Sequence, residues 1–161
     1  MNKLIIYADG ASRGNPGPAG IGVVIAADDD TVLEEISENI GQQTNNAAEY
    51  TALIKALERA QALGAAELDI YVDSELVERQ LSGAYKVKSP NLRPLRDKVL
   101  RLMNGFDKVS ISHVRRCHNA RADRLAKQAA AKESPTGDPP SEANIESAAN
   151  RNATSQLNFE L

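Results

Sequence analysis

The chain has 161 residues, of which 42% are hydrophobic and one is cysteine, so it can form one domain with an ordinary core and no internal disulfide. Its N-terminus, MNKLIIYADG, lacks the apolar stretch of a signal peptide or membrane span, so we expect a cytoplasmic protein without membrane contact. The net charge of −3 conceals a division: residues 1–85 carry 5 Lys/Arg and 14 Asp/Glu, whereas residues 86–132 carry 13 and 3. That division is typical of a protein that binds a polyanion through its basic half. It is equally typical of a protein with two solvated, charged helix faces.

The hydrophobic pattern changes between strand and helix periods up to residue 132. It predicts strands at residues 3–9, 20–27, 31–40, 67–72 and 108–114. It predicts helices at about residues 46–63, 74–82, 92–103 and 120–132. The first three strands have short connections and should form an antiparallel meander, whereas the later strands alternate with helices and should pair in parallel. We therefore expect an α/β domain with a mixed five-stranded sheet flanked by helices.

Two segments read as irregular. Residues 11–20, ASRGNPGPAG, are rich in Gly and Pro and predict a turn after the first strand. Residues 134–155 are rich in Pro, Ser, Asn and Ala with almost no large apolar side chains, which predicts a disordered linker. The sequence thus predicts one domain over residues 1–133, a linker, and a short terminal peptide at residues 156–161.

Four acidic side chains stand where strands end or helices start. Asp9 and Asp73 close the apolar runs LIIYAD and LDIYVD, while Glu49 and Asp123 lie near the starts of two helices. Strand ends and helix starts can meet at one edge of an α/β sheet, where ligands usually bind. Carboxylates gathered there would repel one another, and a divalent cation is the usual way to remove that cost. The pattern therefore favours a metal-dependent enzyme.

Each acidic position also has a purely structural interpretation. Asp9 could initiate a turn, and Asp73-Ser74 could form the N-cap of a helix. Glu49 could be a first-turn glutamate stabilised by the helix dipole, although it shares the inward-facing stripe of its helix. Asp123 could form an ordinary ion pair with Lys127, four residues later. Each position taken alone is weak evidence for a metal site, and the case depends on their combination.

Taken in order, the segments DGASRGNPG, TNNAAEY, VDSELV and HNARADRLA resemble the type 1 ribonucleases H. The resemblance runs from about residue 3 to residue 132 and contains all four acidic motifs. It implies the ribonuclease H fold, with strand order 3-2-1-4-5 and the first and fourth strands side by side. It also implies hydrolysis of the RNA strand of an RNA–DNA hybrid, leaving 5′-phosphate and 3′-hydroxyl ends.

The resemblance further implies cofactors and substrate contacts. Two Mg²⁺ ions, for which Mn²⁺ can substitute, would be held by Asp9, Glu49, Asp73 and Asp123, with Asp9 shared between both. Asn45 and Asn46 match the pair that reads minor-groove base edges and 2′-hydroxyls, with helix capping as the structural alternative. The other expected substrate contacts are Gly10, Ser12, Asn15, Thr44 and Asn119.

Two features depart from the family's pattern. Asp123 follows Asp73 by 50 positions, too few for the extra basic helix and loop of the best-known members. This short form lacks that basic protrusion, so we assign substrate grip to the segment YKVKSPNLRPLR, with Lys86, Lys88, Arg93 and Arg96. The family often has a mobile histidine before the last acidic residue, and His118 is the nearest candidate for that catalytic role. His113 lies inside a predicted strand and is interpreted as structural.

The terminal hexapeptide QLNFEL resembles the peptide by which bacterial replication and repair proteins bind the DNA sliding clamp. The expected contacts are Gln156, Leu157, Phe159 and Leu161. The three apolar residues alternate, as an extended peptide needs in order to fill pockets on one side. A chance pattern in a tail is the alternative, because six-residue motifs are weak evidence.

The expected protein is therefore a monomeric, metal-dependent ribonuclease H. Two other classes stay open: a non-catalytic nucleic-acid-binding module on the same fold, and another nuclease of the superfamily, such as a resolvase or integrase domain. The presence of all four acidic residues argues against the first class. The TNNAAE arrangement before the long helix argues against the second.

Overall fold

The structure is a computed structural model that describes residues 2–132. The predicted linker and terminal hexapeptide lie outside the described residues. The strands are β1 Lys3–Ser12, β2 Gly17–Ala27, β3 Val32–Gln43, β4 Glu67–Val72 and β5 Lys108–His113. The helices are α1 Asn45–Ala62, α2 Glu75–Leu81, α3 Arg93–Met103 and α4 Ala120–Ala131, with a short 3-10 turn, η1 Arg116–Asn119, before α4.

The strands form one mixed sheet in the order β3-β2-β1-β4-β5, which confirms the predicted fold. β2 runs antiparallel to both β1 and β3, whereas β1, β4 and β5 are parallel to one another. The antiparallel pairs follow from the short turns that join β1, β2 and β3. The parallel pairs follow from crossovers through helices. This topology puts β1 at the centre of the sheet with β4 beside it.

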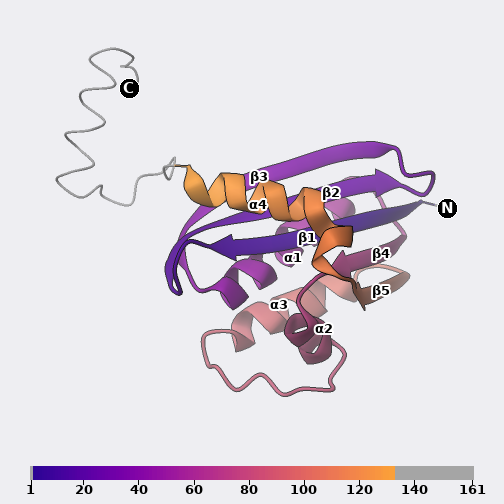
Figure 1. The fold of residues 1–161 in the computed structure, drawn as a ribbon. Helices are drawn as coiled ribbons and strands as arrows, with labels where there is room; N and C mark the ends of the chain where they lie inside the picture. The colour runs from indigo at the N-terminus through magenta and orange to yellow at the C-terminus, as the bar shows by residue number, and fades with distance from the viewer. Residues whose placement is uncertain (1, 133–161) are drawn as a thin grey trace, which may run out of the picture.

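The helices cover the two faces of the sheet differently. α1 packs against β1, β2 and α3, while α4 lies across β1, β2 and β3 on the other face (Figure 1). The main core lies on the α1 side, where Ile6, Leu53, Leu57 and Ile70 are at most 1% exposed. Leu53 and Leu57 belong to the stripe that the helical spacing predicted, so hydrophobic burial orients α1 on the sheet.

β1 is longer than predicted, and its length decides where Asp9 lies. The predicted turn over residues 11–20 is wrong in extent, because β1 continues to Ser12 and β2 begins at Gly17. Asp9 still pairs with β2, whereas the pairing of β1 with β4 stops at Tyr7. Asp9 therefore lies inside β1, at the level where β4 has already ended and the sheet edge opens.

Candidate active site

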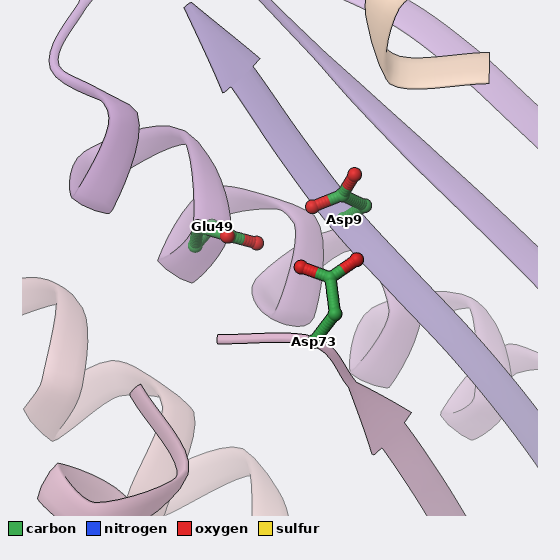
Figure 2. Close-up of side chains that lie close together, drawn as sticks. All are labelled: Asp9, Glu49 and Asp73. Atoms are coloured by element: carbon green, nitrogen blue, oxygen red, sulfur yellow. The ribbon is translucent and has the colours of Figure 1, made fainter. Parts of the chain in front are cut away.

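Three carboxylates meet where β1 passes the end of β4. Asp9 comes from β1, Glu49 from the start of α1, and Asp73 directly follows β4 (Figure 2). One carboxylate oxygen of each residue lies within 4.8 Å of the other two. Asp9 is 3% exposed and Glu49 is 6% exposed, so most of this charge is buried. This three-carboxylate group brings three of the four predicted acidic residues within reach of one cation.

Gly10 lets the start of α1 approach β1. A Cβ at Gly10 would lie 2.2 Å from the carbonyl carbon of Ala48, so any side chain would displace α1. The Gly10 N–H donates to Glu49 Oε1 and to Asp9 Oδ1, each at 3.0 Å. The bare backbone of Gly10 therefore holds the two carboxylates at a fixed separation. This long-range contact requires a glycine at position 10, and the expected contact of Gly10 with substrate stays a prediction.

Asp73 is held from two sides. Ser74 caps α2, because its side chain accepts a hydrogen bond from Val77 N at 3.2 Å, and this fixes the chain immediately after Asp73. Asn119, the last residue of η1, donates through Nδ2 to Asp73 Oδ2 at 3.1 Å and to the Ala8 carbonyl at 3.0 Å. Asn119 therefore ties the carboxylate of Asp73 to β1.

The expected substrate contact Asn119 lies in the interior. It is 1% exposed, and its Oδ1 has no hydrogen-bond partner among residues 2–132. A buried unpaired oxygen costs about 1–3 kcal/mol. Such a cost is expected where a residue serves function through its other atoms. In this structure Asn119 positions Asp73, and a contact to substrate stays a prediction.

Asp123 lines the same cleft and lies beside Asp9, although it is not one of the three carboxylates within 4.8 Å of one another. α4 lies very close to β2, because a Cβ at Gly22 would lie 2.1 Å from the carbonyl oxygen of Ala122. This contact places the start of α4 against the sheet. Lys127 Nζ lies 3.1 Å from Asp123 Oδ2, so the ion pair offered as the structural alternative does form. The pair does not remove Asp123 from the cleft, which both residues line.

Burial and mutual repulsion change the acidity of the three-carboxylate group. Burial, followed by the charges of Glu49 and Asp73, raises the pKa of Asp9 to about 10. Burial also raises the pKa of Glu49 to about 7, partly offset by hydrogen bonding to Asp9. Without a cation, the Asp9–Glu49 pair therefore retains a proton at neutral pH. A divalent cation removes the need for that proton, so cation binding and proton release are linked.

A cleft of about 350 Å³ opens beside the carboxylates. Its lining includes three positively charged side chains, those of Arg13, Arg116 and Lys127. Arg116 lies close enough to Glu49 for its charge to lower the pKa of that residue. Sequence reasoning did not assign a substrate role to any of the three. The basic surplus of residues 86–132 was a signal for two of them, and nothing in the sequence marked Arg13.

Several expected substrate contacts join the β1–β2 turn to the start of α1. Ser12 N donates to Asn45 Oδ1 at 3.3 Å, and Asn45 N donates to Asn15 Oδ1 at 3.0 Å. Thr44 is the N-cap of α1, where its Oγ1 accepts a hydrogen bond from the first turn at 3.2 Å. Asn46 is half-buried in the same turn. These residues therefore brace the rim of the cleft, and their contacts to substrate stay a prediction.

Neither histidine lines the cleft that holds the carboxylates. His118 is exposed in η1 and lines a smaller pocket together with Tyr7 and Arg121. His113 is the exposed last residue of β5. A catalytic role for His118 stays a prediction, and Arg116, two residues earlier, is the η1 residue that lines the cleft.

Lys86 and Lys88 lie on the loop between α2 and α3. Both side chains are exposed, and neither lines the cleft. Val87 between them is buried, and its carbonyl accepts a hydrogen bond from Arg93 Nε at 3.0 Å. The two lysines are thus held on a braced loop and are free to meet a phosphate backbone outside the cleft.

Comparisons with known proteins agree with this fold. A family described as reverse transcriptase-like matches residues 7–129. Ribonuclease HI of Halobacterium salinarum is 50% identical over 127 residues, which cover 79% of this chain and 64% of that protein. The crystal structure of RNase H1 from that organism has a TM-score of 0.77 and 48% identity, covering 79% of this chain and 96% of that one.

Two further matches cover nearly the whole of the other protein. Ribonuclease H of Ehrlichia chaffeensis is 36% identical, and the match covers 79% of this chain and 94% of that protein. The crystal structure of LC11-RNase H1 in complex with an RNA/DNA hybrid has a TM-score of 0.74 and 46% identity, covering 78% of this chain and 95% of that one.

The sheet order and the carboxylates beside its central strand define an α/β protein of ribonuclease H-like architecture. The chain belongs to the type 1 ribonuclease H family. The match covers 64% of the length of the Halobacterium relative, which is less than two thirds. Within residues 2–132, no helix combines the length and the apolar character that crossing a membrane requires.

Proposed function

We propose that the protein is a ribonuclease H that hydrolyses the RNA strand of RNA–DNA hybrids, leaving 5′-phosphate and 3′-hydroxyl ends. The observation that carries the proposal is the three-carboxylate group, because buried charges of one sign are costly unless a cation neutralises them. The complex of LC11-RNase H1 with an RNA/DNA hybrid supports the choice of substrate. A monomer in a reducing cytoplasm is also part of the proposal, and the single, exposed Cys117 supports the reducing compartment.

The residues of the site fit a divalent metal centre. All the donors are carboxylate oxygens, which Mg²⁺ prefers and Mn²⁺ also accepts. Asp9, Glu49 and Asp73 would hold one ion, and Asp9 with Asp123 would hold a second. When bound, such cations neutralise the carboxylates and activate water for attack on the scissile phosphate.

The chain's own residues would bind and orient the hybrid. Arg13, Arg116 and Lys127 line the cleft and would pair with backbone phosphates. Asn45 Oδ1 already accepts a hydrogen bond from Ser12 N, which leaves its Nδ2 to donate to the minor groove. There the 2′-hydroxyl distinguishes RNA from DNA.

The alternative of a non-catalytic binding module is less well supported. Such a module needs the basic side chains of the cleft but not three carboxylates within 4.8 Å of one another. Strongly raised pKa values of buried carboxyl groups in a cleft are typical of functional sites. A resolvase- or integrase-type nuclease would use a similar cluster, and only substrate preference separates it from a ribonuclease H.

The proposal is tested by incubating the full chain with matched RNA–DNA, RNA–RNA and DNA–DNA duplexes in Mg²⁺, in Mn²⁺ and in a chelator. We expect the RNA strand of the hybrid to be cut in the presence of either cation and not in the chelator. Glu49→Gln, which removes one charge at nearly constant size, is the matched inactive control. Preferred cleavage of DNA–DNA, or equal cleavage in the chelator, would contradict the proposal.

Hybrid binding is expected to depend steeply on salt concentration, because the basic residues of the segment 86–132 would contact backbone phosphates. Replacing both Lys86 and Lys88 by Ala should weaken binding and flatten the slope of log K against log[salt] by about one unit per lost phosphate contact. Fluorescence anisotropy over a salt series measures this slope. Lys55→Ala is the control, since it removes a surface lysine whose Nζ lies 3.7 Å from Glu38. An unchanged slope would make Lys86 and Lys88 ordinary solvated residues.

We also propose that residues 156–161 dock the protein on a bacterial sliding clamp, on the support of the sequence pattern alone. A linker of about 22 residues, if it is the flexible coil that the sequence predicts, would span on the order of 25 Å, enough to tether the domain beside a partner. Deleting residues 156–161 should leave turnover on short hybrids intact and remove clamp binding, measured by surface plasmon resonance. Replacing Leu157 and Phe159 by Ala is the control that keeps the chain at full length, and it should also remove clamp binding. Equal clamp affinity of the full-length and truncated proteins would refute this role.

A further inference from the structure

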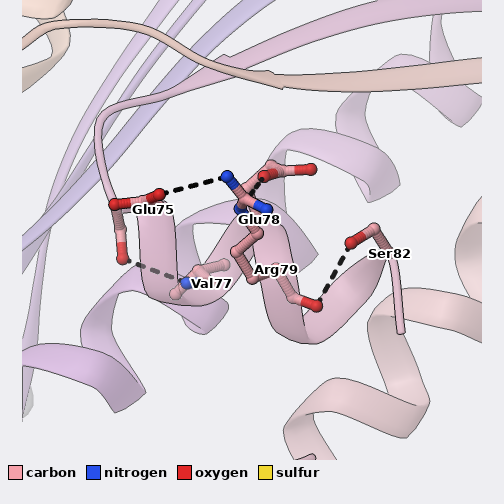
Figure 3. A network of polar contacts seen from close by, with 6 residues as sticks. Glu75, Val77, Glu78, Arg79 and Ser82 are labelled. Carbon is pink, nitrogen blue, oxygen red and sulfur yellow. Dashed lines mark hydrogen bonds and ion pairs between the residues drawn. The ribbon is translucent and has the colours of Figure 1, made fainter. Parts of the chain in front are cut away.

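The short helix α2 begins directly after Asp73 and its capping residue Ser74, so its placement affects where the Asp73 carboxylate lies. On its outer side, Arg79 Nη2 lies 3.2 Å from Glu75 Oε2 and Nε lies 3.5 Å from Glu78 Oε1 (Figure 3). Arg79 and Glu75 are largely exposed, and exposed ion pairs contribute little to stability. The outer polar network therefore cannot hold this seven-residue helix against the rest of the domain.

The inner side of α2 carries one buried polar residue, Gln80, between the buried Val77 and Leu81. Tyr50 Oη of α1 donates to Gln80 Oε1 at 2.6 Å, and the Tyr50 side chain is fully buried. A short hydrogen bond in the interior thus joins α1 to α2.

Each end of this bond lies close in sequence to a carboxylate of the metal site. Tyr50 is the neighbour of Glu49, and Gln80 lies on the helix that starts after Asp73. We propose that Tyr50 and Gln80 are positioning residues, whose hydrogen bond sets the separation between the Glu49 and Asp73 carboxylates. This inference rests on the proposed function, because it concerns the cation that these carboxylates would hold. Neither Tyr50 nor Gln80 lines the cleft, so both act through their helices.

Two variants separate positioning from stability. Tyr50→Phe keeps the ring and its packing but leaves Gln80 Oε1 buried without its donor, which lowers the stability of the fold. The double variant Tyr50→Phe/Gln80→Leu replaces both polar partners by apolar groups, and such a replacement can be nearly neutral for stability. The double variant therefore keeps the fold and lacks the link. Tyr85→Phe, which removes a hydroxyl from an exposed tyrosine, is the matched control.

The readout is the Mn²⁺ affinity of the substrate-free full chain, measured by isothermal titration calorimetry. We expect both variants to bind about threefold to tenfold more weakly than wild type, a smaller loss than removing a direct partner of a metal ligand. The KM for the hybrid should be unchanged, whereas turnover at subsaturating Mn²⁺ should fall. Urea unfolding reports stability separately for each protein, and Tyr85→Phe should match wild type in every measurement.

Two outcomes would overturn the inference in different ways. If the double variant recovers both wild-type stability and wild-type Mn²⁺ affinity, Tyr50 and Gln80 only stabilise the fold, and the proposed function is untouched. If wild type itself neither binds Mn²⁺ nor cuts the hybrid, the proposed function fails and takes the positioning role with it.

Discussion

Asp9→Asn is expected to lower the rate of hydrolysis of an RNA–DNA hybrid by about a thousandfold or more. The reason is that a bound metal would stabilise the transition state by several kcal/mol, and this variant loses that stabilisation. Asp9 is the most central of the carboxylates: its neighbours in the site are Glu49, Asp73 and Asp123. Hybrid binding should stay measurable, because it is distributed over many phosphate contacts. Initial rates with labelled hybrid and binding by fluorescence anisotropy measure the two effects separately.

The matched control for this variant is Asp69→Asn, the same change on the neighbouring strand β4 outside the cleft. Asp69 pairs with Lys3 at 2.9 Å on the surface, so its loss should cost little stability and no activity. Turnover of Asp9→Asn close to that of wild type in Mg²⁺ would remove Asp9 from the reacting set. It would also leave the raised pKa of Asp9 without a functional explanation.

The parts of the site that were predictable from sequence are those that depend on one element at a time. Glu49 falls on the inward-facing stripe of α1, and Asp73 ends an apolar strand, so periodicity alone places both near the sheet. That β1 and β4 are adjacent came from the family resemblance rather than from the residues. The adjacency is confirmed, and it is what brings Asp9 and Asp73 together.

The parts that sequence reasoning missed depend on contacts between distant segments. The resemblance makes Gly10 an expected substrate contact, but the sequence does not show that its missing Cβ makes room for Ala48, 38 positions away. Asn119 is likewise an expected substrate contact, and nothing in the local sequence shows that its side chain will donate hydrogen bonds to Ala8 and Asp73. At these two positions the structure is determined by contacts with distant segments, which local sequence signals do not show. Both positions adjoin the carboxylates.

The sequence also predicts His118 as the functional residue of this segment and does not single out Arg116, for a similar reason. Both lie in η1, and a 3-10 turn directs successive side chains about a third of a turn apart. Sequence spacing therefore cannot tell which of them faces the cleft until the turn is placed against β1. In the structure Arg116 lines the cleft, whereas His118 lines the smaller pocket.

Without a divalent cation, the protein is expected to lose stability as the pH rises from about 4 to about 10. The folded state raises the pKa of Asp9 from 3.8 to about 10 and that of Glu49 from 4.5 to about 7. Below both ordinary values each group is protonated in the folded and unfolded states. Between the ordinary and the raised values the unfolded chain releases protons that the folded Asp9–Glu49 pair keeps, so folding becomes less favourable as the pH rises.

A divalent cation should reverse this trend, because it binds the deprotonated carboxylates of the folded state. The difference in Tm between Mg²⁺ and a chelator should therefore widen as the pH rises. Scanning calorimetry at about pH 5, 7 and 9 measures this difference. In the chelator, Asp9→Asn should show a shallower fall in Tm than wild type, and Asp69→Asn should follow wild type. A Tm in the chelator that is constant over this range, or a fall that Asp9→Asn shares in full, would show that the buried pair carries no proton and that Asp9 is not the group linking stability to the cation.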